Sequence, residues 1–279
     1  MTIPSPPGRG DNAEISPLPV RFRTLRSAPA TGTHNMALDL ALLDRARLSG
    51  EAVWRCYAWS RPTISFGRNE IVRGRFDAAS LSRAALDAVR RPTGGRALLH
   101  SREVTYSVTA PVASDLPWRA AYAAINSILL RALRALGVDA MLVPDAESEA
   151  VRPDGPVCFD RPAAGEITVH GAKLVGSAVW RERGAYLQHG SILLHDDQSL
   201  LASAMIAPPT MPTPRAASLD AWFASRGLAT PSWSSVADSL EHALATEHDV
   251  TPMEADVSLM AATERTEADL SSAHWLWRR

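Results

Sequence analysis

The two cysteines of the chain lie in different surroundings. Cys158 occurs in Pro156-Val157-Cys158-Phe159-Asp160-Arg161-Pro162, a loop-like segment with charged residues beside the thiol. A thiol near cations can act as a nucleophile, although a single loop cysteine can equally be inert. Cys56, in the apolar run VWRCYAW, is typical of a buried structural thiol. The sequence therefore makes Cys158 the candidate nucleophile.

Lys173 is the one lysine in the chain, against 28 arginines. Codon usage in a GC-rich genome explains why arginine replaces lysine elsewhere, but not why one lysine remains. Arginine serves wherever a cation only pairs with a carboxylate, whereas it cannot replace a compact ammonium. Lys173 is therefore a candidate functional residue, with a solvated charge at a strand edge as the alternative. Strand alternation predicts Lys173 and Val175 on one face, and Leu174 and Gly176 on the other.

A basic, glycine-containing turn runs from Arg90 to Arg96 with the sequence RRPTGGR and leads to His100. Adjacent glycines allow main-chain N–H groups to approach a ligand closely, and the arginines supply fixed positive charge. The alternative is an ordinary turn with solvated arginines. The spacing fits neither a P-loop nor the dinucleotide-binding fingerprint.

A third segment begins at Lys173 with GAKLVGSA, which contains Ser177, and continues to YLQHGS, which contains His189 and Gly190. A glycine inside a strand indicates either close approach of another chain segment or a bulge. His189 is a candidate for lining a site, without an assigned role.

The composition limits the class of protein. The chain has 279 residues, of which 46% are hydrophobic and 21% charged, so it can bury a large core. A net charge of −1 and a pI near 6.7 do not indicate a nucleic-acid binder. We expect no membrane span, because no long uncharged apolar run occurs. Two cysteines and an N-terminus without an apolar signal region favour a cytoplasmic location.

The pattern along the chain predicts a mixed α+β protein. A flexible tail over 1–19 precedes a helix capped by Thr33 or Asn35 and ended by Gly50. A hinge is expected over 208–214, and the segments after residue 200 are predicted to be mainly helical. The strands are expected over 20–25, 53–59, 63–66, 138–143, 166–170, 173–180 and 185–194, with another in VTYSVTA, and further helices over 77–88, 118–136, 219–225, 232–245 and 253–270.

Taken together, these residues resemble the lipoate/biotin protein ligase superfamily, and within it the cysteine-dependent octanoyltransferases of lipoate assembly. The resemblance covers roughly residues 20–194. It rests on seven motifs in family order, namely NMALDLALL, PTISFGR, RRPTGGRALLH, VTYSV, CFD, GAKLVGSA and LQHGSILL. Arg96 stands where ATP-dependent lipoate ligases typically have a third glycine, and Cys158 where they have no nucleophile.

The resemblance implies a mixed, largely antiparallel sheet flanked by helices, with a catalytic domain over 20–200 and a helical extension over 201–279 packed on it. It implies transfer of an octanoyl group through a Cys158 thioester, with Lys173 stabilising the oxyanion. Such exchange needs no cofactor and no metal. The acyl-binding residues that it implies are Arg91, Gly94, Gly95, Arg96, His100, Ser177, His189 and Gly190.

The partners implied are proteins. Acyl carrier protein is the expected octanoyl donor, with another lipoyl domain as the alternative donor. The acceptors are lipoyl domains, such as glycine cleavage H protein or the acyltransferase subunits of 2-oxoacid dehydrogenases. No nucleic acid or membrane partner is expected. An exposed cluster could receive an acidic carrier, unless its members pair internally with Asp and Glu; it comprises Arg90, Arg91, Arg96 and Arg102.

Two other functions stay open. One is an ATP-dependent lipoate ligase, which would need ATP and Mg²⁺ and in which Cys158 would be incidental. The other is a non-catalytic lipoyl-binding protein. The family often has an acidic residue directly after the histidine of RRPTGGRALLH, and this chain has Ser101 there.

Overall fold

A computed structural model describes residues 17–112, 118–144, 162–182, 184–207 and 215–278 of the chain. Cys158, the tail over 1–16, the polar loop over 145–157 and the expected hinge over 208–214 lie outside the described residues. The elements are β1 (Arg21–Arg26), α1 (Gly32–Ser49), β2 (Val53–Tyr57), β3 (Thr63–Phe66), α2 (Ala78–Arg83), β4 (Asp87–Arg90), β5 (Leu98–His100), β6 (Glu103–Pro111), α3 (Trp118–Ala135), β7 (Met141–Leu142), β8 (Ile167–Val169), β9 (Ala172–Glu182), β10 (Ala185–Leu193), α4 (Leu200–Ser203), α5 (Leu219–Ala224), α6 (Trp233–Ala245), β11 (Asp249–Pro252), α7 (Val257–Leu270) and α8 (Ala273–Leu276).

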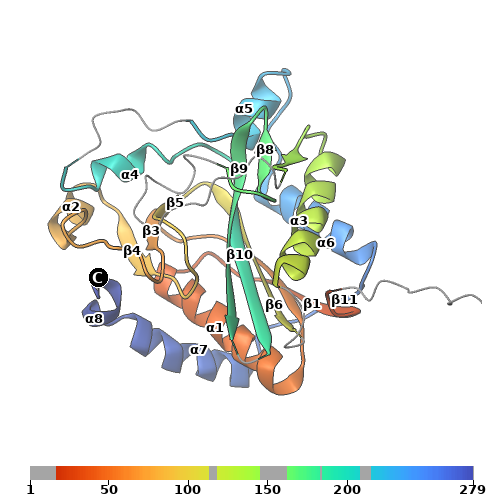
Figure 1. Cartoon of the computed structure of the whole chain (residues 1–279), viewed down its shortest axis with the longest axis horizontal. Helices are drawn as coiled ribbons and strands as arrows, with labels where there is room; N and C mark the ends of the chain where they lie inside the picture. The colour runs from red at the N-terminus through yellow and green to blue at the C-terminus, as the bar shows by residue number, and fades with distance from the viewer. Residues whose placement is uncertain (1–16, 113–117, 145–161, 183, 208–214, 279) are drawn as a thin grey trace, which may run out of the picture.

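The main sheet has eight strands in the order β11-β1-β2-β6-β10-β9-β8-β7. β1 pairs in parallel with both of its neighbours, and the other pairs are antiparallel. A second sheet of three strands, in the order β4-β3-β5, lies beside it (Figure 1). The predicted α+β class with a mixed, largely antiparallel sheet is confirmed.

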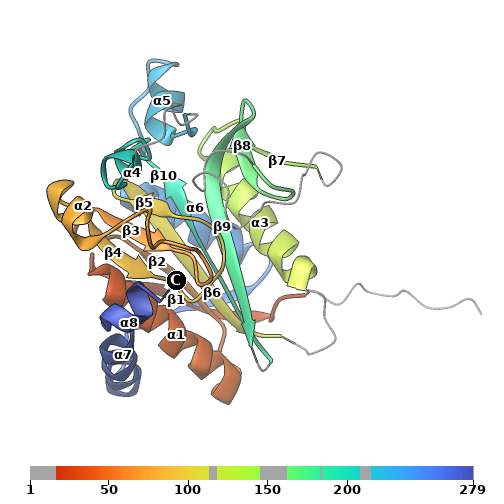
Figure 2. The same cartoon turned by 60° about the vertical axis from the view of Figure 1, so that its left-hand side comes forward.

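Helices cover both faces of the main sheet. α3 and α6 pack on one face and share the largest apolar cluster with β2, β6 and β10. α1 and α7 lie side by side on the other face, where Figure 2 shows them below the sheet. The long strand β10 is buried along its whole length, because helices or the small sheet cover both of its sides.

The helix caps follow local chemistry, with one difference from the sequence prediction. Thr31, rather than Thr33 or Asn35, caps α1, because its side chain accepts a hydrogen bond from the His34 N–H. Asn35 is inside the helix and binds Arg55 instead. Gly50 ends the helix in the left-handed conformation, as predicted.

The helix expected over 77–88 is wrong in its second half. Asp77 caps a short α2 through a reciprocal bond with Ser80, and Ala85 turns the chain with a φ of 54°. The chain then enters β4, which pairs in parallel with β3. The alanine-rich sequence of this segment favours a helix, but the pairing with β3 determines its structure.

The C-terminal part also contributes a strand. The helix expected over 253–270 begins only at Val257, where Asp256 caps it, and the preceding residues form β11. β11 pairs with β1 at the edge of the main sheet. The strand expected over 138–143 is reduced to β7. The division into 1–19, 20–200 and 201–279 stays a prediction.

The β8–β9 hairpin turns at His170 and Gly171, both with positive φ, as its sequence indicated. Its register shifts so that Thr168 pairs with Lys173 and Ile167 with Val175, which leaves Leu174 as an extra residue. Leu174 and Val175 both pack in the main apolar cluster. The predicted strict alternation is therefore wrong at this point, because an irregularity interrupts the strand.

Candidate active site

A narrow cavity, partly open to solvent, lies between the small sheet and the main sheet, with about 40 Å³ of space that a water molecule can reach. Six of the eight residues expected to bind the acyl group line it: Arg91, Gly95, His100, Ser177, His189 and Gly190. Gly94 and Arg96 are not among the described residues that line it. The other lining residues are Met36, Tyr57, Ser65, Leu98, Thr105, Gly176, Ala178 and Ser191.

Arg91 holds the RRPTGGR turn from inside. Its guanidinium donates to the carbonyl oxygens of Ser65 at 2.7 Å, Gly94 at 2.8 Å and Arg96 at 2.8 Å. Arg90 is also fully buried and donates to the carbonyl oxygen of Gly67 at 2.6 Å. Arg91 therefore forms part of the cavity wall, and Arg90 ties the start of the turn to Gly67.

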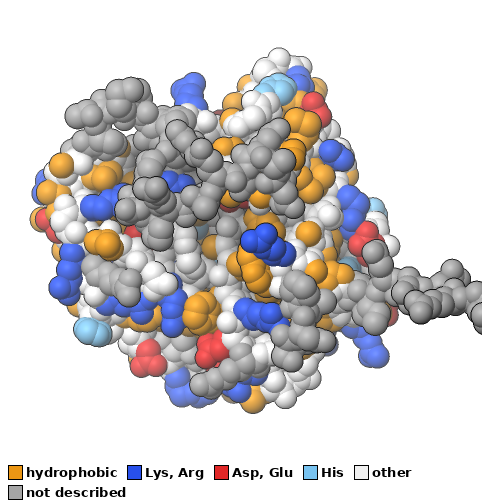
Figure 3. Space-filling view, in the orientation of Figure 1, with side chains coloured by type: hydrophobic (Ala, Val, Ile, Leu, Met, Phe, Trp, Pro, Cys, Tyr) orange, Lys and Arg blue, Asp and Glu red, His pale blue; other side chains and the backbone are white. Residues whose placement is uncertain are grey.

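The expected arginine surface for an acidic carrier is consequently wrong. Arg90, Arg91 and Arg96 are buried, and only Arg102 is exposed, where it pairs with Asp197. Main-chain carbonyl groups accept the bonds of Arg90 and Arg91, because a guanidinium offers five donors to a tight turn. Figure 3 shows basic side chains spread over the described part of one face, without a single patch.

The glycines of the turn have different roles. Gly95 has a φ of 93°, and a Cβ there would lie 2.6 Å from Nη2 of Arg91. A Cβ on Gly67 would lie 1.9 Å from the Gly95 carbonyl oxygen. A Cβ on Gly94 would meet nothing within 4 Å. The Arg91 side chain thus crowds Gly95, and the Gly95 carbonyl group crowds Gly67, while the approach of the glycine pair to a ligand stays a prediction.

His189 lies in a buried polar network that crosses the cavity. Its Nδ1 lies 3.2 Å from Oδ2 of Asp39 on α1, and its Nε2 lies 2.7 Å from the hydroxyl of Thr93. Burial lowers the pKa of His189, although Asp39 acts in the opposite direction. The neutral ring therefore donates from Nδ1 to Asp39 and accepts from Thr93 at Nε2.

Asp39 is the centre of this network. Burial alone would raise the pKa of Asp39, but the Arg55 guanidinium at 2.7 Å and the hydrogen bonds from His189 and Ser107 hold it below its usual value. The carboxylate is thus ionised and fixes the tautomer of His189. Tyr57 also donates to it at 3.0 Å.

His100 is held in a second network. Its Nδ1 lies 2.7 Å from Oε1 of Glu103, and its Nε2 lies 2.7 Å from the hydroxyl of Ser65. Trp59 stacks on the ring with centroids 3.9 Å apart. Thr105 and Ser191 donate to the same Glu103 oxygen. Ser101 follows His100 directly, so the carboxylate partner of this ring comes from Glu103, three residues after it.

Ser177 and Gly190 form part of the opposite wall. Gly190 continues the pairing of β10 without a bulge, and a Cβ there would lie 2.5 Å from the Gly176 carbonyl oxygen. Close approach, rather than a bulge, explains this glycine. The Ser177 hydroxyl lies 2.7 Å from the hydroxyl of Tyr106, whose pKa burial raises to about 12.

Lys173 is buried on β9, three residues before the cavity-lining Gly176. Its Nζ lies 2.7 Å from Oε1 of Glu166, and the two side chains are 3% and 8% exposed. This excludes the alternative of a solvated strand-edge charge. Lys173 is not among the described residues that line the cavity.

Cys56 is fully buried, and burial raises the pKa of its thiol to about 12. The thiol is therefore neutral, as the structural interpretation of Cys56 requires.

Three carboxylates of the site, Asp39, Glu103 and Glu166, were not predicted. Asp39 had a sequence signal, because an acidic residue inside the apolar run NMALDLALL is unusual unless it has a buried partner.

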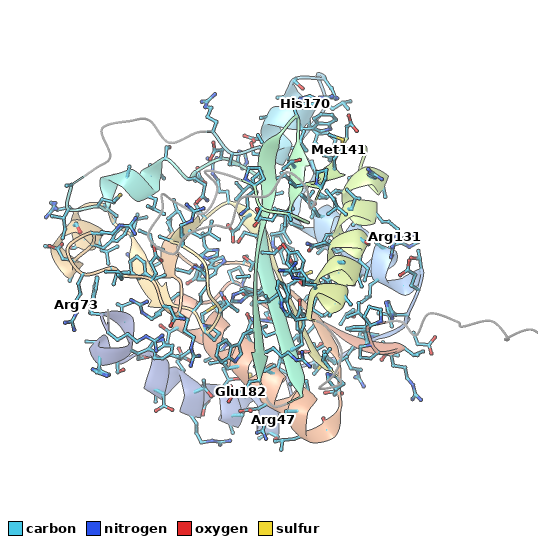
Figure 4. The ribbon with its side chains drawn as sticks, in the orientation of Figure 1. Arg47, Arg73, Arg131, Met141, His170 and Glu182 are labelled. Carbon is cyan, nitrogen blue, oxygen red and sulfur yellow. The ribbon has the colours of Figure 1, made fainter. Side chains whose placement is uncertain are left out.

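Figure 4 shows Arg73 and Arg131 at opposite sides of the molecule, with His170 and Glu182 near the two ends of β9. Among the described residues, no group of three or more His, Cys, Asp or Glu side chains could hold a metal ion. In the same part of the chain, none of the helices combines the length and apolar character needed to cross a membrane.

Comparison with curated relatives gives a consistent family. An octanoyltransferase LipM of Anoxybacillus flavithermus is 40% identical over 195 residues, covering 67% of this chain and 70% of the relative. One of Kyrpidia tusciae is 41% identical over 197 residues, covering 67% and 71%. One of Bacillus subtilis is 37% identical over 195 residues, covering 67% and 70%.

Solved structures support the same fold. A putative lipoate protein ligase of Thermoplasma acidophilum with bound lipoic acid has a TM-score of 0.75 at 19% identity, covering 92% of this chain and 99% of that chain. A lipoate-protein ligase A bound with ATP has a TM-score of 0.76 at 19% identity, covering 92% and 98%. The model of the lipoyl protein ligase A/B catalytic domain matches residues 31–222. The resemblance predicted from the motifs is thereby confirmed, and the chain belongs to the family of the lipoyl protein ligase A/B catalytic domain.

Proposed function

We propose that this chain is a protein N-octanoyltransferase, in which Cys158 carries the acyl group as a thioester. The observation that supports this best is the cavity between the RRPTGGR turn and β9, the strand that carries the one lysine of the chain. Relatives that are 37–41% identical carry the name octanoyltransferase. The donor is octanoyl-acyl carrier protein or an octanoylated lipoyl domain, and the acceptor is a lipoyl-domain lysine.

The reaction has two acyl exchanges at one sulfur. The Cys158 thiolate attacks the carbonyl carbon of the donor thioester, and the carrier sulfur leaves and takes up a proton. The acceptor amine then attacks the Cys158 thioester, the amide bond forms, and the amine proton passes to the leaving thiolate. Exchange between thioesters is nearly balanced and amide formation is downhill, so no ATP is required. Each step passes through an oxyanion.

Lys173 is the proposed partner of that oxyanion. A buried ammonium stabilises developing negative charge more strongly than a solvated one, because water screens it less. The neutral His189 and the paired His100 hold the two walls of the acyl pocket together, with Ser177 and Gly190 on the strand side. Gly94 and Arg96 shape the turn without lining the pocket.

The first test is an intact-mass measurement of the purified protein with octanoyl-acyl carrier protein, without ATP. We expect a gain of one octanoyl group, absent in Cys158→Ala and retained in the matched control Cys56→Ala. Normal turnover by Cys158→Ala would contradict the covalent mechanism.

The same measurement separates the alternatives. If octanoyl-acyl carrier protein gives no adduct, an octanoylated lipoyl domain is offered as the donor. If only free lipoate with ATP and Mg²⁺ gives a modified lipoyl domain, the chain is an ATP-dependent ligase. Binding of the lipoylated domain without any transfer would identify a non-catalytic binding protein. A cytoplasmic location is part of the same proposal, because both carrier proteins belong to central metabolism.

A further inference from the structure

Glu166 places a buried carboxylate directly against Lys173. Its Oε1 lies 2.7 Å from Nζ of Lys173, and both side chains are at least nine-tenths buried. Other cations in the described part of the chain that form ion pairs with Asp or Glu are arginines or histidines. An ion pair alone would therefore not need a lysine at this position.

The second carboxylate oxygen fixes Glu166 in place. Its Oε2 accepts the Ala163 N–H at 2.8 Å, and the Glu166 N–H donates to the Ala163 carbonyl oxygen at 3.0 Å. Val143 and Gly165 tie the same turn to the end of β7, with bonds of 2.8 and 2.9 Å. Because one oxygen is held by the main chain, the other points at Lys173 in a defined direction.

A chain of buried hydrogen bonds links this turn to the cavity wall. The Gly165 carbonyl oxygen accepts from Asn126 at 2.7 Å, and Gln188 donates to the Asn126 side-chain oxygen at 2.9 Å. Gln188 also donates to the Tyr106 hydroxyl at 2.9 Å. The Tyr106 hydroxyl shares a further hydrogen bond with the hydroxyl of Ser177, which lines the cavity. The turn that carries Glu166 is thus held in register with the wall of the cavity.

We propose that Glu166 is a positioning residue for Lys173, which keeps the ammonium protonated and aimed at the reacting carbonyl group. The inference rests on the proposed function, because it assigns Glu166 a role in that same acyl exchange. A buried ion pair contributes little to stability compared with an apolar pair of similar volume. A compact ammonium held by a fixed carboxylate gives instead a directed positive charge, and an opposite charge beside an ammonium favours its protonated form.

The test is a double-mutant cycle with single-turnover acylation of Cys158, read by intact mass. The variants are Glu166→Gln, Lys173→Met and their combination. We expect Glu166→Gln to slow acylation on the order of 10–100-fold, less than the roughly 10²–10³-fold expected for loss of the ammonium itself. In the Lys173→Met background the same change should alter the rate less than about twofold, since interacting residues are not additive.

A pH profile supplies a readout that a purely structural role would not move. Without the carboxylate, a buried ammonium gives up its proton more readily. As the pH is raised, Glu166→Gln should therefore begin to lose activity at a lower pH than the unsubstituted protein does. An unchanged profile, or an equal loss of rate in both backgrounds, would overturn the proposal. Should Glu166→Gln not fold, Glu166→Asp, which keeps the charge but shortens the side chain, goes through the same cycle, and an equal loss of rate in both backgrounds would overturn the proposal.

Glu182→Gln is the matched control, because Glu182 is exposed at the other end of β9, far from the His170 turn (Figure 4). It should leave rate and profile unchanged. If the unsubstituted protein forms no acyl-enzyme with any donor, the proposed function fails. If it forms one and the cycle is additive, only the role of Glu166 fails.

Discussion

The two cationic ends of the site hold positive charge in different ways. At one end Arg91 donates to neutral main-chain carbonyl groups of the turn that it supports. At the other end Lys173 faces the ionisable carboxylate of Glu166. A guanidinium with five donors is suited to holding a loop together, whereas a small ammonium is suited to meeting a charge that appears during a reaction. In a chain with 28 arginines, we infer from this difference that the arginine end maintains the structure and that the lysine end acts in the proposed reaction.

This contrast also explains why the arginine end is a poor docking surface. A guanidinium that donates to Ser65, Gly94 and Arg96 cannot turn to a substrate carboxylate without opening the turn. The histidines lie between the two ends, and each is oriented by a carboxylate: His189 by Asp39 and His100 by Glu103. The two histidines that line the cavity are therefore fixed in orientation by the folded protein.

The largest expected effect comes from exchanging the two kinds of cation at the lysine end. Lys173→Arg keeps the charge and can still pair with Glu166, so we expect it to fold. The broad guanidinium should not reach the position of the ammonium, and single-turnover acylation should slow roughly 10²–10³-fold. Arg131→Lys, at an exposed pair with Glu247, is the control and should leave the rate unchanged. Near-normal kinetics of Lys173→Arg would show that position 173 does not require an ammonium.

The reverse exchange at the arginine end should affect folding more than chemistry. Arg91→Lys removes donors from buried carbonyl groups of Gly94 and Arg96, each of which is costly to leave without a partner. We expect the free energy of unfolding to fall by roughly 2–4 kcal/mol. Urea unfolding checks the value. A variant as stable as the unsubstituted protein would show that Arg91 does not build the turn.

The sequence predicts local features of this site better than distant ones. The RRPTGGR turn, the hairpin at Gly171 and the cap at Gly50 depend on residues next to one another, and they are confirmed. β4 and β11 were missed, because each is fixed by parallel pairing with an earlier strand, β4 with β3 across α2 and β11 with the distant β1. Their own residues carry no strong strand pattern.

Of the three carboxylates that were missed, only Asp39 lies far along the chain from its partner, whereas Glu103 is three positions from His100. Asp39 meets His189 only after α1 packs on β10, across 150 positions of the chain. Glu166 is only seven positions from Lys173, and it lies two residues before Thr168, which pairs with Lys173 across the hairpin. Residue type alone drew attention to the cationic residues of the site, whereas their carboxylate partners were recognised only in the folded structure.

A smaller effect tests the space inside the arginine end. Gly95→Ala would place a Cβ 2.6 Å from Nη2 of Arg91 at a φ of 93°. Strain and crowding together should cost about 1–3 kcal/mol. Gly94→Ala is the matched control, because a Cβ there meets nothing within 4 Å. Thermal unfolding of the two variants should therefore separate neighbouring glycines, and equal melting temperatures would contradict the assignment of Gly95.

The smallest effect concerns the histidine between the two ends. Burial lowers the pKa of His189 in the folded protein, so between that value and the unfolded pKa near 6.5 the unfolded chain binds more protons. The stability is therefore complete above about pH 6.5 and declines as the pH falls toward the folded pKa, with a slope of at most about 1.4 kcal/mol per pH unit for one proton. Asp39, whose pKa is also lowered, adds a further loss only below its unfolded value near 3.8. Urea unfolding between pH 7 and pH 5 measures the slope, and His189→Gln should make it shallower. If the slope is the same in both proteins, His189 does not carry it, and the ring between the two ends is protonated to the same extent in the folded and unfolded chains.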